Sequence, residues 1–183
     1  MKTARYYLTL LVSLCCAMLV SCVSVTYPEP TNSELELGKT LVPPEGKGLL
    51  VAYRKPGGVA GKIPTRVHVD GKPYGGTRPG TFVVIPVSKG RHVFHLFADN
   101  QVPDPEGVLA FPVNISEGEC LFIHQWVDAS TTGYAVLPAG PAVVPMPTIS
   151  VLPRSVVVSK ETGRAETAGC KQLGGIGSLK VGN

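Results

Sequence analysis

Short apolar runs separated by glycine and proline dominate the middle of the chain. In residues 108–115, Leu109, Phe111, Val113 and Ile115 fall on every second position, which is the period of a half-buried strand. Turn residues separate this run from six others with strand character, at 48–54, 66–70, 81–87, 91–98, 119–128 and 133–137. The Asp70-Gly71 pair at the end of the run 66–70 is a strong signal for a tight hairpin. This spacing predicts an all-β fold, a small antiparallel β-sandwich.

Residues 119–128 carry apolar side chains at both even and odd positions, with Phe122 and Trp126 on one face and Leu121 and Ile123 on the other. A strand of this kind is central and covered on both faces. The second cover is either a partner or the tail of the chain.

The first residues have a different pattern. Lys2 and Arg5 precede an apolar run over residues 7–20, which is too short for an ordinary membrane-spanning helix, and Cys22 follows Ser21. This arrangement resembles a bacterial lipoprotein signal peptide with its lipobox. The resemblance implies removal of residues 1–21 and attachment of diacylglycerol to Cys22. A cleaved signal without lipid and an uncleaved anchor are the alternatives.

Two or more acyl chains hold a protein stably at a bilayer without a spanning segment. In lipoproteins of this kind an aspartate after the cysteine often means retention in the inner membrane, and this chain has Val23 there. We therefore expect a lipid anchor in the cell envelope, in the outer membrane and facing the periplasm.

The expected organisation has three parts after the signal. Residues 22–46 contain four prolines and predict an extended tether, with a short helical turn near 32–37 capped by Asn32 or Ser33. Residues 47–138 form the sandwich domain. Residues 139–183 form a proline-rich arm, suited to an edge strand or an extended segment, followed after Lys160 by a disordered tail.

Charge narrows the class of partner. Loss of the signal removes Lys2 and Arg5 from the 17 basic residues and none of the 13 acidic ones, so the net charge falls from +4 to +2. Proteins that bind nucleic acid normally carry a much larger positive charge, so no nucleic-acid partner is expected.

Two cysteines, Cys120 and Cys170, remain beside the acylated one. An oxidising envelope permits a disulfide between them, worth roughly 3–4 kcal/mol in the chain-entropy model. The alternative is a buried thiol at Cys120 and a separate one at Cys170.

Residues with catalytic or metal-binding chemistry are sparse. Of the four histidines, His92 and His95 fall on opposite faces of one predicted strand, and no His-x-His or Cys-x-x-Cys spacing occurs. No Gly-x-Ser-x-Gly elbow is present, and the glycine-rich residues 55–62 lack the Gly-Lys-Ser/Thr ending of a phosphate-binding loop. We expect no enzyme, no metal and no cofactor.

Three residues are candidates for recognition. Tyr74 and Trp126, together with Tyr53 and Phe82, would form an aromatic platform for a sugar if they were exposed, and would be core if they were not. Arg54 closes an apolar strand and is either a structural ion-pair residue or a recognition residue.

Several short motifs, taken in order, resemble a bacterial envelope family filed as domain of unknown function 2846. They are a strand ending in Tyr53-Arg54, a strand running into Asp70-Gly71-Lys72, a Gly80-x-Phe82 strand, and a turn at Gly90 before His92. The pattern is also similar to PEGA domains and other transthyretin-like sandwiches. The resemblance covers about residues 46–128 and implies a sandwich fold without an accepted enzymatic activity.

Two hypotheses for function follow. In the first, a non-catalytic lipoprotein uses its sandwich to bind a protein partner or a cell-wall glycan. In the second, it is a structural subunit of an envelope assembly, and the arm at 142–159 adds a strand to a neighbouring chain. An enzyme or metal-binding protein is a weaker alternative.

Overall fold

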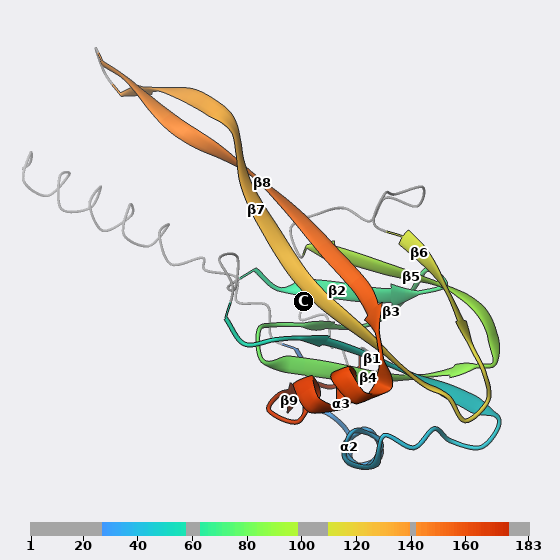
Figure 1. Ribbon diagram of the computed structural model, residues 1–183. Helices are drawn as coiled ribbons and strands as arrows, with labels where there is room; N and C mark the ends of the chain where they lie inside the picture. The colour runs from blue at the N-terminus through green and yellow to red at the C-terminus, as the bar shows by residue number, and fades with distance from the viewer. Residues whose placement is uncertain (1–26, 58–62, 99–109, 140–141, 176–183) are drawn as a thin grey trace, which may run out of the picture.

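Two β-sheets pack face to face in the computed structural model, which describes residues 27–57, 63–98, 110–139 and 142–175 (Figure 1). The five-stranded sheet has the order β8-β7-β1-β4-β9, and the four-stranded sheet has the order β3-β2-β5-β6. The elements are α2 (Asn32–Thr40), β1 (Lys47–Arg54), β2 (Thr65–Val69), β3 (Lys72–Thr77), β4 (Thr81–Ser88), β5 (Gly90–Ala98), β6 (Ala110–Ile115), β7 (Cys120–Ala139), β8 (Ala142–Val158), α3 (Lys160–Thr167) and β9 (Lys171–Gln172). The predicted all-β sandwich is confirmed, and among the described strands the larger sheet has two parallel pairs, β1–β7 and β4–β9.

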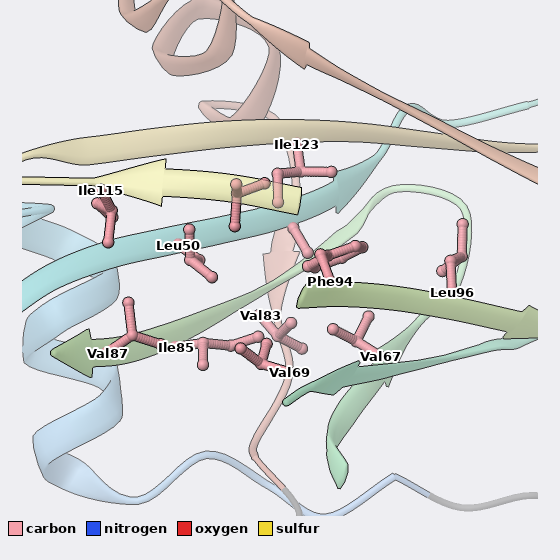
Figure 2. Packing of buried hydrophobic residues seen from close by; sticks show 12 residues of the cluster. Leu50, Val67, Val69, Val83, Ile85, Val87, Phe94, Leu96, Ile115 and Ile123 are labelled. Carbon is pink, nitrogen blue, oxygen red and sulfur yellow. The ribbon is translucent and has the colours of Figure 1, made fainter. Parts of the chain in front are cut away.

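The inner core lies between the two sheets (Figure 2). It combines Leu50 of β1, Ile85 of β4, Phe94 of β5 and Ile123 of β7 with residues of β2 and β6. All four side chains are completely removed from water, which is the main favourable contribution to folding.

The β2–β3 hairpin confirms the turn expected at Asp70-Gly71. Both residues have positive φ, 51° and 74°, as a two-residue type I′ turn requires. Aspartate and glycine tolerate this left-handed region better than other residues do, so the register of these strands is specified locally.

The segment before the sandwich is docked and not an extended tether, at least from Tyr27 onward. Its helix α2 is longer than the predicted turn, and the N-cap is Thr31, which forms a capping box with Glu34. Leu37 and Leu41 then pack against the outer cluster, which consists of apolar residues on the outer face of the larger sheet such as Leu49, Val51 and Phe122. The tyrosine hydroxyl of Tyr27 donates a hydrogen bond to the Thr65 carbonyl (2.9 Å).

The C-terminal segment also differs from the expectation, because residues 160–172 are ordered into α3 and β9. Ser159 caps the helix by accepting a hydrogen bond from the Thr162 amide (3.2 Å). The buried Gly163 lies so close to Phe122 that an added Cβ would come within 2.1 Å of its ring. Small residues permit this close packing, so the segment docks despite having few large apolar side chains.

The proline-rich arm is β8, and its whole length pairs with β7 of the same chain. The run expected at 133–137 is part of β7, which continues to Ala139 across a bulge between Thr131 and Gly133. β7 pairs with β1 only over residues 120–125, and beyond that point the β7–β8 hairpin projects from the sandwich as a two-stranded ribbon (Figure 1).

The contact between α3 and the sheet can be tested with Gly163→Ala. Alanine favours a helix by about 0.5–1 kcal/mol over glycine, but here its methyl group would overlap Phe122, so we expect a net loss of about 1–3 kcal/mol in the free energy of unfolding. Urea denaturation measures this. Gly169→Ala is the matched control, because nothing lies within 4 Å of its added Cβ, and it should change stability little. Equal stability of the two variants would contradict the docking of α3.

Candidate functional site

The expected lipid-attachment residue, Cys22, lies outside the described residues, so lipidation stays a prediction. Within the described residues, no helix is long and apolar enough to cross a membrane.

Cys120 and Cys170 are free thiols, so the disulfide predicted for them is absent from the structure. Both sulfurs are accommodated separately. Cys120 is buried in β7, and the Cys170 thiol faces the backbone carbonyls of Glu166 (3.4 Å) and Arg54 (3.6 Å). Burial raises the pKa of both thiols, and the Glu166 carboxylate raises that of Cys170 further. Raised pKa values disfavour the thiolate and therefore nucleophilic chemistry.

Arg54 is buried, with 4 % of its surface exposed, so it is not a surface recognition residue. Its guanidinium Nη1 donates a hydrogen bond to the Ile63 carbonyl (2.6 Å), and burial lowers its pKa. The structural interpretation of Arg54 is therefore supported, with a backbone carbonyl as its partner.

A polar cluster lies beside Arg54 at one end of the inner core. Gln125 is its direct neighbour in the β1–β7 ladder and accepts a hydrogen bond from Thr77 (2.5 Å), whose hydroxyl also contacts that of Thr65 (2.8 Å). The Gln125 Nε2 atom has no partner among the described residues. These contacts link β2, β3 and β7 across the sandwich.

Tyr74 does not belong to the same surface as Trp126. It lies on β3 in the smaller sheet and is half-buried against the inner core, whereas Trp126 lies on β7 in the larger sheet. The platform predicted from these two residues is therefore not formed.

Trp126 is instead the exposed end of another aromatic row. Its ring stacks on that of His124 (centroids 5.5 Å apart), which lies 5.2 Å from the ring of the buried Tyr53. Trp126 is 36 % exposed. These three residues, the aromatic row, lie on the outer face of the larger sheet because β7 side chains alternate and Tyr53 pairs directly with His124 in the parallel ladder.

Charged groups fix the buried end of the aromatic row. The Tyr53 hydroxyl donates to Glu166 of α3, and Lys55 forms an ion pair with the same carboxylate, both at 2.5 Å. Lys55 and then Tyr53 lower the pKa of Glu166, while burial and the Glu166 hydrogen bond raise that of Tyr53. Burial and the nearby lysine lower the pKa of His124, so its ring is neutral at pH 7. The row is thus uncharged, with its exposed end at Trp126 and its buried end at Tyr53, next to the Glu166 carboxylate.

β8 continues this surface beside the row. Val156 pairs with His124 and is 45 % exposed, and Arg154 pairs with Trp126. The Arg154 guanidinium lies 3.4 Å from the Asp128 carboxylate, and both groups are exposed. An indole ring, an apolar side chain and an ion pair therefore lie together at the base of the hairpin.

His92 has a structural role at the β2–β3 turn. Its Nδ1 lies 2.7 Å from the Asp70 carboxylate and its Nε2 lies 2.7 Å from the Ser88 carbonyl. Because both neighbours are acceptors, the doubly protonated ring satisfies both, and the pKa of His92 is raised while that of Asp70 is lowered. In the part of the chain that the structure describes, no three His, Cys, Asp or Glu residues are grouped so as to hold a metal ion.

Comparisons with protein-family models, with curated proteins and with solved structures found no match to this chain. The resemblance to the domain-of-unknown-function 2846 family and to PEGA-like sandwiches therefore stays a prediction.

The sequence grouped Trp126 with Tyr53 among the candidate aromatic residues but did not identify His124, whose ring lies between them. The alternation His124-x-Trp126 was a usable signal, because it places both rings on one face of a strand. Tyr53 joins them only through the pairing of β1 with β7, which lies outside any local pattern.

The His92–Asp70 pair predicts a pH dependence. The pKa of His92 in the folded state lies above the ordinary value of 6.5. The interaction of protonated His92 with Asp70 therefore stabilises the fold fully below pH 6.5, and this contribution is lost as the pH rises through the folded-state pKa. Asp70→Asn, which keeps a residue that tolerates positive φ, should lower the free energy of unfolding by about 0.5–1 kcal/mol at pH 6. The difference from the native protein should shrink towards pH 9. Urea titrations at several pH values measure it.

His68 and His124 have lowered pKa values and contribute with the opposite sign, but they are present in both proteins and cancel in the difference. Asp128→Asn removes a carboxylate whose ion-pair partner is Arg154 and is the control. A constant difference between native protein and Asp70→Asn from pH 6 to pH 9 would contradict the role of His92.

Proposed function

We propose that this chain is a non-catalytic lipoprotein of the cell envelope, held at the outer membrane through an acylated Cys22 and facing the periplasm. Its β-sandwich presents the β7–β8 hairpin to a protein partner. The observation that carries the proposal is the hairpin itself, which leaves the sheet after residue 125 and continues as two strands.

A two-stranded ribbon alone in water is marginally stable. Beyond residue 125, β7 pairs only with β8 among the described residues. A partner that pairs with or packs on the ribbon would supply the missing stabilisation, so a binding role accounts for its length.

The composition of the ribbon supports the same role. Residues 129–153 contain no Asp, Glu, Lys, Arg or His, whereas Asp128 and Arg154 stand at its base. Charged side chains normally protect exposed strands from pairing with other chains. Their absence over this stretch favours contact with another polypeptide.

In the second hypothesis, the arm adds a free strand to a neighbouring chain, and this part of the hypothesis has to be revised. Residues 142–158 already pair with β7, so the arm would act in an assembly as part of a hairpin and not as a free strand.

A crosslinking experiment in intact envelopes tests anchoring and the role of the hairpin together. Native protein, Cys22→Ala, and a variant in which an Asn-Gly turn joins Ser130 to Ser150 are each given a photocrosslinker on the hairpin base. Ser130 and Ser150 are direct partners, so a two-residue turn fits between them. We expect native protein in the membrane fraction with crosslinked partner, Cys22→Ala in the soluble fraction, and the short-hairpin variant in the membrane without crosslinks.

Mass spectrometry of residue 22 accompanies this experiment. An unmodified cysteine there in native protein would refute the anchor, and undiminished crosslinking by the short-hairpin variant would refute the binding role of the ribbon.

A cell-wall glycan is a second candidate ligand, and the aromatic row favours it. Sugars stack their apolar faces on exposed indole rings while nearby carboxylates accept hydrogen bonds from hydroxyl groups. Trp126 and Glu166 provide these two groups on one face of the sheet, joined through His124 and Tyr53.

Trp126→Ala tests this candidate by titration with soluble peptidoglycan fragments. Removal of the ring should weaken binding about 5- to 150-fold, because a stacked aromatic contact contributes about 1–3 kcal/mol. Tyr74→Ala, a substitution on the other sheet, should leave glycan affinity unchanged. If native protein does not bind the fragments, or if Trp126→Ala binds them equally well, the glycan role is excluded.

A further inference from the structure

The backbone of β7 has two edges, and the direction of its amide and carbonyl groups can be derived residue by residue. The Glu119 carbonyl accepts a hydrogen bond from the Leu49 amide of β1 (2.9 Å). Since successive residues of a strand direct their backbone groups to opposite edges, odd-numbered residues of β7 face β1 and even-numbered residues face β8. Past the end of β1, the odd-numbered residues face an edge with which no described strand pairs.

The same reasoning applies to β8. Val127 of β7 pairs with Pro153, so odd-numbered residues of β8 face away from β7. Pro145, Pro147 and Pro153 are all odd-numbered. The bulge between Thr131 and Gly133 shifts the parity of β7, and Pro138 beyond it pairs with Val143 and also faces outward.

The two edges of the hairpin therefore differ in the number of outward-facing prolines. Proline has no amide hydrogen to donate, so the outer edge of β8 lacks donors at three positions and cannot form a complete ladder. The open edge of β7 over residues 127–136 has no proline, and its outward amides belong to Val127, Ala129, Thr131, Tyr134 and Val136. One edge is blocked against strand addition, and the other is intact.

Charged side chains along the open edge of β7 affect which molecule can pair with it. When two identical strands pair antiparallel about a two-fold axis, each side chain near the axis faces its own copy or a close neighbour, and like charges there oppose association. Within residues 127–136, the segment at this edge, the one charged side chain is Asp128, near one end. When the segment pairs antiparallel with its own copy, each Asp128 lies opposite the far end of the partner segment and not opposite the other Asp128. A lipid occupant is disfavoured, since an unpaired backbone amide or carbonyl costs several kcal/mol in hydrocarbon. A second copy satisfies the same groups on both chains.

We propose that the open edge of β7, residues 127–136, pairs antiparallel with the same edge of a second copy of this chain. The proposal rests on the proposed role of the hairpin as the binding element, and it names the partner.

Sedimentation equilibrium of the full-length protein in detergent tests it over a concentration series. Ala129→Pro removes one outward amide from the β7 edge, and thus two hydrogen bonds from a two-fold dimer. Ala129→Ser keeps the amide. Ile149→Pro removes an outward amide from the β8 edge directly across the hairpin, as Ile149 pairs with Thr131. We expect native protein, Ala129→Ser and Ile149→Pro to dimerise with similar affinity, and Ala129→Pro to dissociate at least about tenfold more readily.

Far-ultraviolet circular dichroism confirms that each variant is folded. Native protein that is monomeric throughout the series would overturn the proposal, and so would a dimer equally stable in Ala129→Pro. Equal loss of affinity in both proline variants would place the contact elsewhere on the hairpin and also refute it. Should the protein be monomeric while its hairpin still crosslinks to a different envelope protein, self-pairing fails and the proposed function stands.

Discussion

The fold depends on the burial of β1 on both of its faces. Seven of its eight residues are buried, and only Lys47 is exposed. Leu50 and Ala52 belong to the inner core, and Leu49, Val51 and Tyr53 belong to the outer cluster. A strand of this kind needs a second sheet on one face and another cover on the opposite face, because apolar surface left in water costs about 25 cal/mol per Å². α2 and α3 provide that cover, so the segments on both sides of the sandwich are part of the folded unit.

The parallel pairing of β7 with β1 has a second consequence, because β7 is longer than its neighbour. Its first residues are held in the centre of a sheet, and its remainder has only β8 as a partner. The sandwich thus fixes the direction of the hairpin at its base. The Tyr53–Glu166 hydrogen bond and the Lys55–Glu166 ion pair link α3, β1 and the chain after β1 at that point. The anchored base and the projecting ribbon are therefore two parts of one strand: residues 120–125 of β7 pair with β1 in the sheet, and the later residues pair with β8.

Local signals in the sequence were sufficient for several strands of the sandwich. Alternation located β2 and β6, and Asp70-Gly71 specified the first hairpin, since these features depend on neighbours in sequence. β3 was not among the predicted runs, because its residues Lys72–Thr77 include Pro73, Gly75 and Gly76. The full length of β7 was not predicted, because Gly133 and Pro138 are typical of strand ends. The structure accommodates them with a bulge and with an outward-facing proline. α3 was missed for a related reason: its glycine lowers helix propensity, and the contact that stabilises it is with the distant Phe122. The partner of Arg54 and the aromatic row likewise depend on long-range pairing.

The two candidate contacts on β7 do not compete for the same groups. Strand addition uses backbone amides and carbonyls, which lie in the plane of the sheet, whereas Trp126 projects from its face. In β7 before the bulge, the residues whose backbone faces the open edge are odd-numbered, and those in the aromatic row are even-numbered. A second copy paired along the edge would therefore not cover the outer face of the sheet, which carries Trp126. The sheets of the two copies would join into one extended sheet, and both aromatic rows would lie on it. A protein contact along the edge and a ligand on the face are thus compatible.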